Sequence, residues 1–281
     1  MAAELNTLTR ELGTIERREP LAGGSINRAW RLTLKGGRVL FAKTHPNPPS
    51  DFFTAEAAGL ETLAEANAIR VPRVLAVSQQ GLVLEWLDGR PGGRHWQRMG
   101  EQLAALHGHS RRQFGFSRDN YCGLTPQPNP AMDDGFAFFA EARLLHQCRL
   151  ARDRGRLDSG PVRRLEWLAG RLERWIPPQP ASLIHGDLWA GNAHCGPAGE
   201  PVLIDPATHY GWAEAELAMT TLFGGFPAAF YDAYLAHGAV APDWEERADL
   251  YNLYHRLNHL NLFGAAYHGG VVSVIRRYAP Q

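Results

Sequence analysis

The hydrophobic and polar positions of the chain change their pattern near residue 90 of 281. Before that point, short segments such as Val39–Thr44 alternate between the two kinds of side chain, which indicates β-strands. Beyond it, apolar residues recur every three or four positions, which is typical of amphipathic helices. The pattern predicts strands at 15–18, 29–34, 38–44, 73–78 and 81–87, and helices at 2–13, 51–67, 94–109, 133–153, 157–175, 212–223, 227–237 and 243–267.

A stretch rich in glycine, DGRPGG at 88–93, separates the two patterns. Glycine and proline favour turns and connections over regular elements. We therefore predict an α+β protein with two lobes. Residues 1–87 would form a small N-terminal lobe around an antiparallel sheet, 88–93 the hinge, and 94–281 a larger, mainly helical lobe.

One stretch within the helical part, Leu183–Tyr210, is rich in turns and carries polar side chains at the ends of short apolar runs. Asn192 follows Asp187 by five positions, and Asp205 ends the run Pro201–Ile204. In phosphoryl transfer, one carboxylate accepts the proton of the attacking hydroxyl, while an amide and a second carboxylate hold magnesium on the nucleotide phosphates. The spacing therefore predicts a phosphoryl-transfer site.

The N-terminal part supplies three features that such a site needs. A turn at Gly23, Gly24 and Ser25 would let backbone N–H groups approach phosphates, although a plain hairpin has the same composition. Lys43 lies in an apolar strand, so it either reaches solvent or meets an anion. Glu56, on the helix at 51–67, is either solvated or the partner of Lys43 that kinases require. The order of these parts along the chain is that of a two-lobed kinase.

Composition and charge narrow the class of protein further. Basic and acidic side chains number 29 each, which argues against a nucleic-acid partner or a membrane surface. A hydrophobic content of 44% is that of an ordinary globular protein. Three widely spaced cysteines favour a reducing compartment, and the N-terminus lacks the apolar core of a signal peptide. We therefore expect a cytoplasmic protein.

Several motifs together point to one family. They are GGSINRAW, FAKT, FTAEAAGLETL, DNYCGLTPQPN, HGDLWAGN, IDPATHYGWAEAELAM and LNHLNLFG. With them the chain resembles the fructosamine kinase (ketosamine-3-kinase) family, whose relatives include aminoglycoside and choline phosphotransferases within the protein-kinase-like fold. The resemblance covers nearly the full length. HGDLWAGN and LNHLNLFG are its most specific parts.

The resemblance implies an ATP- and Mg2+-dependent kinase that phosphorylates a sugar hydroxyl, at the 3-position, of a ketosamine on a free amino acid or a protein lysine. Asp187 would be the base, and Asn192 and Asp205 would bind magnesium. Lys43 would contact the nucleotide phosphates and Glu56 would orient it. The residues that would surround ATP are Gly23, Gly24 and Ser25 over the phosphates, and the backbone of Glu85, Trp86 and Leu87 along the adenine edge.

The residues that would bind the sugar, which accepts the phosphoryl group, are less clearly indicated by the sequence. Trp189, beside the predicted base, is a candidate to pack on a sugar ring, and His259 is the preferred substrate contact on the C-terminal helix. His255 and His259 lie one helical turn apart, a spacing that also suits plain packing or a metal. Only about seven residues separate Asp205 from the helix that begins near Trp212. Because that leaves little room for a peptide-docking loop, a small-molecule acceptor is favoured.

The sequence departs from the family pattern at two positions. Ala190 stands where the family has a small hydroxyl residue, and Glu216 stands where it usually has aspartate. Both leave the details of the substrate open. The Gly-rich turn contains no cysteine, so a redox switch at that position is not expected.

Three alternatives remain open at this stage. The first is a related phosphotransferase that acts on an aminoglycoside, choline or a similar acceptor. The second is a metal-dependent hydrolase that uses His185, Asp187, His194 and His209, although it would leave Lys43 without a role. The third is a nucleotide-binding pseudoenzyme, against which the complete set of phosphate-site residues counts.

Overall fold

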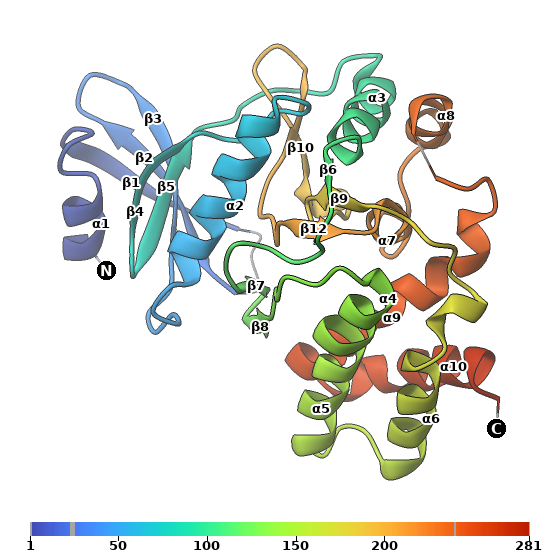
Figure 1. Ribbon diagram of the computed structural model, residues 1–281. Helices are drawn as coiled ribbons and strands as arrows, with labels where there is room; N and C mark the ends of the chain where they lie inside the picture. The colour runs from blue at the N-terminus through green and yellow to red at the C-terminus, as the bar shows by residue number, and fades with distance from the viewer. Residues whose placement is uncertain (1, 23–25, 239, 281) are drawn as a thin grey trace.

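The computed structural model describes residues 2–22, 26–238 and 240–280, so the predicted glycine-rich turn at Gly23, Gly24 and Ser25 lies outside the described residues. The chain folds into a sheet-containing part and a helical part (Figure 1). The sheet has five antiparallel strands in the order β1-β2-β3-β5-β4. The strands are β1 (Ile15–Leu21), β2 (Arg28–Leu34), β3 (Val39–Thr44), β4 (Val74–Ser78) and β5 (Gly81–Glu85).

Two helices, α1 (Ala2–Leu8) and α2 (Phe52–Ala66), cover opposite faces of this sheet. The alternation of β5 sets the arrangement, because successive side chains of a strand point to opposite faces. Val83 packs in the same apolar cluster as Leu5 of α1, whereas Leu82 and Leu84 pack with α2. The sheet is therefore buried on both sides, and β3 lies in its centre.

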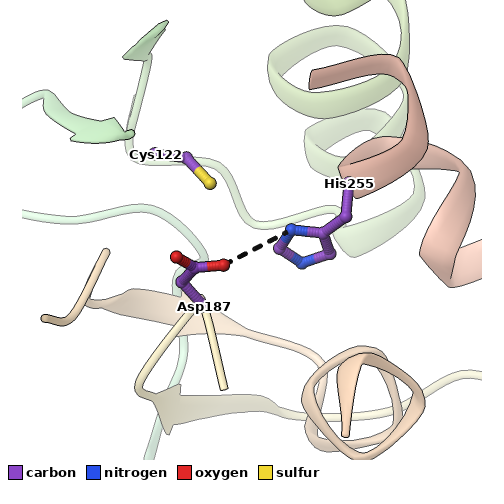
Figure 2. Close-up of side chains that lie close together, drawn as sticks. All are labelled: Cys122, Asp187 and His255. Atoms are coloured by element: carbon purple, nitrogen blue, oxygen red, sulfur yellow. Dashed lines mark ion pairs between the residues drawn. The ribbon is translucent and has the colours of Figure 1, made fainter. Parts of the chain in front are cut away.

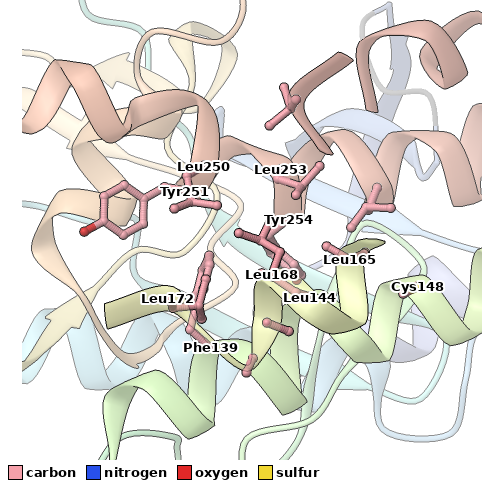
Figure 3. Packing of buried hydrophobic residues seen from close by; sticks show 14 of the residues in the cluster. Phe139, Leu144, Cys148, Leu165, Leu168, Leu172, Leu250, Tyr251, Leu253 and Tyr254 are labelled. Carbon is pink, nitrogen blue, oxygen red and sulfur yellow. The ribbon is translucent and has the colours of Figure 1, made fainter. Parts of the chain in front are cut away.

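The rest of the chain is mainly helical and is organised around the long helix α9 (Trp244–Phe263). Figure 3 shows side chains of α9, such as Leu250, Leu253 and Tyr254, interleaved with Leu165 and Leu168 from another helix. The helices are α3 (His95–His107), α4 (Gly135–Phe138), α5 (His146–Asp153), α6 (Ser159–Ala169), α7 (Ala213–Met219), α8 (Ala228–His237) and α10 (His268–Tyr278), with a π-helical turn at Phe139–Leu145 and 3-10 turns at Leu172–Arg174, Ala190–Asn192 and Ala265–Tyr267.

Short strands between the two parts carry the segments that the sequence singled out. They form one three-stranded sheet and two hairpins. The strands are β6 (Ser110–Arg111), β7 (Asn120–Cys122), β8 (Thr125–Gln127), β9 (Ala181–Ile184), β10 (Ala193–Cys195), β11 (Pro201–Leu203) and β12 (His209–Gly211). The loop after β9, residues 185–192, carries Asp187, which the family resemblance predicts to be the base, and is named the catalytic loop for that prediction.

The α+β architecture with an antiparallel sheet followed by helices is the one that the sequence predicts. The helix predicted at 2–13 ends at Leu8, and the one at 157–175 ends as an α-helix at Ala169. Helix α10 was not predicted, because its pattern runs on from that of α9. The boundary at 88–93 stays a prediction, since one apolar cluster joins Leu60 and Leu84 to Met99 and Leu103 across it. None of the described helices is long and apolar enough to cross a membrane.

Helix α7 carries two buried carboxylates that fix its surroundings. Glu214 accepts hydrogen bonds from Nε and a terminal nitrogen of Arg247, both at 3.0 Å, and from the Tyr251 hydroxyl at 2.8 Å. Such paired contacts satisfy a carboxylate that could not remain buried alone. They attach α7 to α9.

Glu216 holds the start of the catalytic loop. Its carboxylate accepts hydrogen bonds from the backbone N–H groups of His185 (2.9 Å) and Gly186 (2.6 Å). It also accepts one from Nε2 of His107 at 3.0 Å, and Nδ1 of the same ring forms a hydrogen bond with the Tyr234 hydroxyl at 2.7 Å. The Glu216 carboxylate, both ring nitrogens of His107 and the Tyr234 hydroxyl therefore each have a partner, which is the condition for a stable buried network. The network joins α3, α7 and α8 to the loop.

We predict that Glu216→Gln lowers the free energy of unfolding by roughly 2–3 kcal/mol at neutral pH, because hydrogen bonds to a charged group are lost and an amide N–H group meets a backbone donor. Burial alone would raise the pKa of Glu216, but the hydrogen bond and charge of His107 bring that pKa below the ordinary 4.5. The ionised carboxylate therefore stabilises the folded state above pH 4.5, and this stabilisation is lost as the pH falls below it.

Thermal unfolding at a series of pH values measures this effect. The difference in the free energy of unfolding between the wild type and Glu216→Gln should be largest at neutral pH and shrink in acid. Glu61→Gln removes the same charge from an exposed position on α2 and should show no such pH-dependent difference. If Glu216→Gln lowers the free energy of unfolding by the same amount at all pH values, the charge of Glu216 does not stabilise the fold.

Candidate active site

The residues predicted from the sequence meet on one cavity of about 780 Å³ between the sheet and the helical part. The sheet side contributes Lys43 and the segment that follows β5, and the helical side contributes the catalytic loop and α9. The predicted residues on its wall are Lys43, Glu56, Glu85, Trp86, Leu87, Asp187, Trp189, Asn192, Asp205 and His259. Ala22 and Ile26, which flank the undescribed turn, also line it.

Lys43 is buried in the centre of the sheet, with a side chain only 4% exposed. Its ammonium group forms ion pairs with Glu56 of α2 and, at 2.7 Å, with Asp205. Burial by itself lowers the pKa of Lys43, but the charges of Asp205 and Glu56 outweigh it, and the pKa lies above its ordinary value. The lysine is therefore a fixed cation. It is not the solvent-exposed strand lysine that the sequence also allowed.

Asp205 follows β11 in a conformation that few residues adopt. Its φ is +57°, in the left-handed region that non-glycine residues seldom occupy. Aspartate tolerates this region better than most side chains, and strained positions of this kind cluster at ligand sites. The side chain is 48% exposed, and Oδ1 contacts Lys43. Oδ2 is not engaged in that bond.

Asp187 is placed by the backbone of the catalytic loop. Gly186, with φ +85°, has no room for a side chain, because a Cβ there would collide with the Ala207 carbonyl oxygen. The Asn192 amide nitrogen donates a hydrogen bond to the Asp187 carbonyl oxygen at 2.7 Å and lies 3.5 Å from Oδ2. The loop therefore fixes both the backbone and the carboxylate of Asp187.

The surroundings of Asp187 favour the protonated acid more than water does. Burial, followed by the negative charges of Asp205 and Glu216, raises the pKa of Asp187 to about 7, and the hydrogen bond from Asn192 acts in the opposite direction. A carboxylate with such a pKa is well matched to accept a proton near neutral pH. A cation bound beside it would lower this pKa again.

The donor atoms near Asp205 suit a hard cation. The amide nitrogen of Asn192 is engaged with Asp187, which leaves its oxygen available. Together with the carboxylate of Asp205 it offers the oxygen ligands that Mg2+ prefers. These residues therefore fit a magnesium ion.

The segment at the end of β5 is held from outside the cavity. The Glu85 carboxylate accepts hydrogen bonds from Arg70 at 3.0 Å and from the Arg73 backbone N–H at 3.1 Å. Arg70 also pairs with Glu200, next to β11. Arg70 therefore links β5 to the β10–β11 hairpin, and the Glu85 side chain is fully engaged in these contacts.

Aromatic rings line another part of the cavity wall. Trp189, 38% exposed, packs edge-on against Phe223 with ring centroids 5.7 Å apart. The ring centroid of Phe223 in turn lies 5.1 Å from that of His259, and the His259 ring also contacts Phe263. Nδ1 of His259 lies 2.7 Å from the His255 carbonyl oxygen, and because a carbonyl can only accept, Nδ1 carries the proton. Nε2 of the neutral ring is then an acceptor.

The structure also assigns roles that the sequence reasoning missed. The amides of Asn120 and Gln127, on the β7–β8 hairpin, donate hydrogen bonds to the carbonyl oxygens of Thr208 (2.8 Å) and Ala207 (3.1 Å). The hairpin thus supports the segment that follows Asp205. Glu216, which the sequence marks only as a departure from the family pattern that leaves the details of the substrate open, anchors the catalytic loop. Asn120 and Gln127 gave no separate signal, because amides are common in turns.

In the part of the chain that it describes, the structure does not bring together the metal ligands that a metal-dependent hydrolase would need. The rings of His185, His194 and His209 each contact a backbone carbonyl oxygen, those of Ile204, Cys195 and Ala207. Among the described residues these three histidines form no metal-type cluster with Asp187. The cluster that does include Asp187 is made with other residues.

Comparison with known proteins agrees with the geometry. The family model described as fructosamine kinase matches residues 1–281. A Synechocystis protein named as a ketoamine kinase is 45% identical over 276 residues, which cover 95% of this chain and 92% of that protein. The protein-ribulosamine 3-kinase of Arabidopsis thaliana chloroplasts is 36% identical over 269 residues, covering 92% of this chain and 81% of that protein.

A solved structure leads to the same result. A Thermobifida fusca protein assigned as a fructosamine-3-kinase superposes with a TM-score of 0.89 at 35% identity, covering 100% of this chain and 99% of the other. The family resemblance and the protein-kinase-like fold predicted from the sequence are thereby confirmed. The chain belongs to the fructosamine kinase family, and it is a phosphotransferase whose acceptor is an alcohol group.

Proposed function

We propose that this protein is an ATP- and Mg2+-dependent kinase that phosphorylates a sugar hydroxyl, at the 3-position, of a ketosamine such as ribulosamine or fructosamine. The acceptor would be carried by a free amino acid or a protein lysine, in a deglycation role. One observation supports this most strongly: Lys43, Asp187, Asn192 and Asp205 converge on a cavity whose wall also carries aromatic rings. The names of the Arabidopsis and Synechocystis relatives support the substrate class.

Asp187 is the proposed proton acceptor for the sugar hydroxyl. Its carboxylate lines the cavity, its position is fixed by Asn192 and Gly186, and its pKa is raised toward neutrality. A base so placed orients the hydroxyl and takes its proton as the new bond forms. The hydroxyl must therefore enter between Asp187 and the phosphates.

Lys43 is the proposed partner of the nucleotide phosphates, with Glu56 holding it in place. When bound, ATP supplies the phosphoryl group, and Mg2+ held by Asn192 and Asp205 neutralises its charge. Glycines at 23–24 would cover the phosphates. Because the Glu85 side chain is committed to Arg70, the segment Glu85–Leu87 would offer its backbone to the adenine.

The aromatic part of the cavity wall, formed by Trp189, Phe223, His259 and Phe263, is the proposed acceptor pocket. A sugar ring presents apolar C–H groups on its faces, and these pack well on an indole such as Trp189. The unprotonated Nε2 of His259 can accept a hydrogen bond from a second hydroxyl. The two residues would thus orient the acceptor while Asp187 acts on one hydroxyl.

We predict that Asp187→Asn lowers kcat by about 10²- to 10⁴-fold, because the amide cannot accept the proton. The KM for ATP should change only slightly, since the substitution keeps the size of the side chain. Steady-state kinetics with a ribulosamine or fructosamine acceptor measures both constants. Asp153→Asn, an exposed change on α5, is the control. Near-wild-type turnover of Asp187→Asn would refute the role of base.

We predict that Trp189→Ala raises the KM for the ketosamine by about two- to tenfold, as expected for the loss of one aromatic contact of about 0.5–1.5 kcal/mol. The KM for ATP should stay the same, because Trp189 is not among the residues proposed to contact the nucleotide. The same kinetic assay, with each substrate varied in turn, separates the two. Equal increases in both constants would place Trp189 outside the acceptor pocket.

The substrate class is tested by ATP consumption across a panel of acceptors, with products mapped by NMR. We expect turnover of lysines glycated with ribulose or fructose, phosphate on O3, and no turnover of kanamycin or choline. The aminoglycoside or choline alternative predicts the reverse preference. ATP binding without phosphorylation of any amine-linked ketose would favour a pseudoenzyme.

A further inference from the structure

Three side chains with metal-binding atoms, one of them that of Asp187, lie close together beside the catalytic loop. They are Cys122 at the end of β7, Asp187 in the catalytic loop and His255 in the middle of α9 (Figure 2). One ligand atom from each lies within 4.8 Å of the others. These elements are far apart in sequence, so the tertiary fold alone creates the cluster.

His255 has an unused nitrogen directed into this cluster. Its Nδ1 lies 3.9 Å from Asp187 Oδ1, too far for a hydrogen bond, and no other group of the described chain bonds to it. The residue is only 6% exposed, so Nδ1 has no ready access to bulk solvent. Burial, followed by the charges of His259 and Arg143, lowers the pKa of His255 to about 3. The ring is thus neutral, the form that binds metals.

The geometry is close to that of a three-residue metal site. A cation at the centre of the three atoms would lie at most about 2.8 Å from each, against about 2.0–2.3 Å in zinc sites. Small side-chain rotations close that gap. The chemistry also fits, because a thiolate and an imidazole select zinc-like ions, whereas Mg2+ prefers oxygen. A thiolate and a carboxylate together balance a charge of 2+.

We propose that Cys122, Asp187 and His255 form an inhibitory site for a thiophilic divalent cation such as Zn2+. The site is separate from the oxygen ligands offered to magnesium by Asn192 and Asp205. Cys122 and Asp187 both line the main cavity, so the ion can enter from there.

Binding would remove a proton from the thiol and occupy the base. The Cys122 S–H bond breaks, its electron pair forms the S–Zn bond, and the proton passes to the buffer. Burial, followed by the charge of Asp187, raises the pKa of Cys122 well above its ordinary value, so the free enzyme holds the thiol form. The carboxylate of Asp187 then binds the metal and can no longer accept a hydroxyl proton. The inhibitory consequence rests on the proposed role of Asp187; the metal site itself does not.

Cobalt provides a test that does not depend on activity. Co2+ bound to a thiolate gives a sulfur-to-metal charge-transfer band, whereas Co2+ on oxygen ligands does not. We expect this band when Co2+ is added to the full-length protein without nucleotide. Cys122→Ser should abolish it, and His255→Gln should weaken binding at least about tenfold. Cys148→Ser, a second buried thiol that lies outside the cluster, should retain it.

Inhibition by Zn2+ is measured separately, on kinase activity at saturating ATP with each variant normalised to its own zinc-free rate. Wild type and Cys148→Ser should be inhibited, and excess Mg2+ should not relieve the inhibition. His255→Gln and Cys122→Ser should need at least about tenfold more Zn2+ for the same effect.

Several results would overturn the proposal. They are the absence of the charge-transfer band in wild type, a band that persists in Cys122→Ser, or zinc inhibition that excess Mg2+ relieves. If Cys122→Ser does not fold, as judged by circular dichroism, His255→Gln decides the matter through the cobalt titration. A cobalt band in a protein that phosphorylates no ketosamine would uphold the metal site while refuting the proposed function.

Discussion

Lys43 is a permanent cation in a nearly water-free position, and it is stable there because two carboxylates from different parts of the chain surround it. A buried ammonium group without partners would lose its proton or destabilise the fold. Glu56 comes from α2 beside the sheet, and Asp205 comes from the segment after β11 in the helical part. The ion pairs therefore satisfy the charge of Lys43 and place Asp205 relative to the sheet. They add to the links between the two parts that Arg70 and the shared apolar cluster provide.

The same logic recurs at the catalytic loop, where Glu216 holds two backbone N–H groups that no helix or strand would satisfy. A loop must leave backbone groups unpaired unless a side chain meets them, and buried ones are costly. His107 and Tyr234 complete the network through hydrogen bonds at both nitrogens of the His107 ring. Glu216 is one methylene longer than the aspartate that is usual in the family. Its carboxylate serves to support the backbone of the catalytic loop.

The wall of the cavity combines charged and aromatic side chains. Glu56 and Asp205 pair with Lys43, whereas Phe223 packs against both Trp189 and His259. Asp187 also lines the cavity, and its carboxylate lies near Cys122 and His255 (Figure 2). Its position explains both why it suits the acceptance of a proton and why a thiophilic ion could compete for it. The two uses of one carboxylate exclude each other.

Much of this protein could be predicted from its sequence, because the relevant signals are local. Hairpin glycines, strand alternation and helical periodicity indicate the sheet and most helices. The spacing of Asp187, Asn192 and Asp205 on one short stretch indicates the phosphoryl-transfer chemistry. Helix α10 was not predicted, because its apolar positions continue the period of those in α9. Periodicity alone does not show that α9 ends before Gly264.

The tertiary structure decided what depends on distant segments. Whether Lys43 was exposed or paired, and which groups Glu216 contacts, could not be read from neighbours in the chain. The meeting of Cys122, Asp187 and His255 likewise joins a hairpin, a loop and a helix. Residue type and spacing specify which interactions are possible, whereas burial and direction, which only the folded chain provides, select among them.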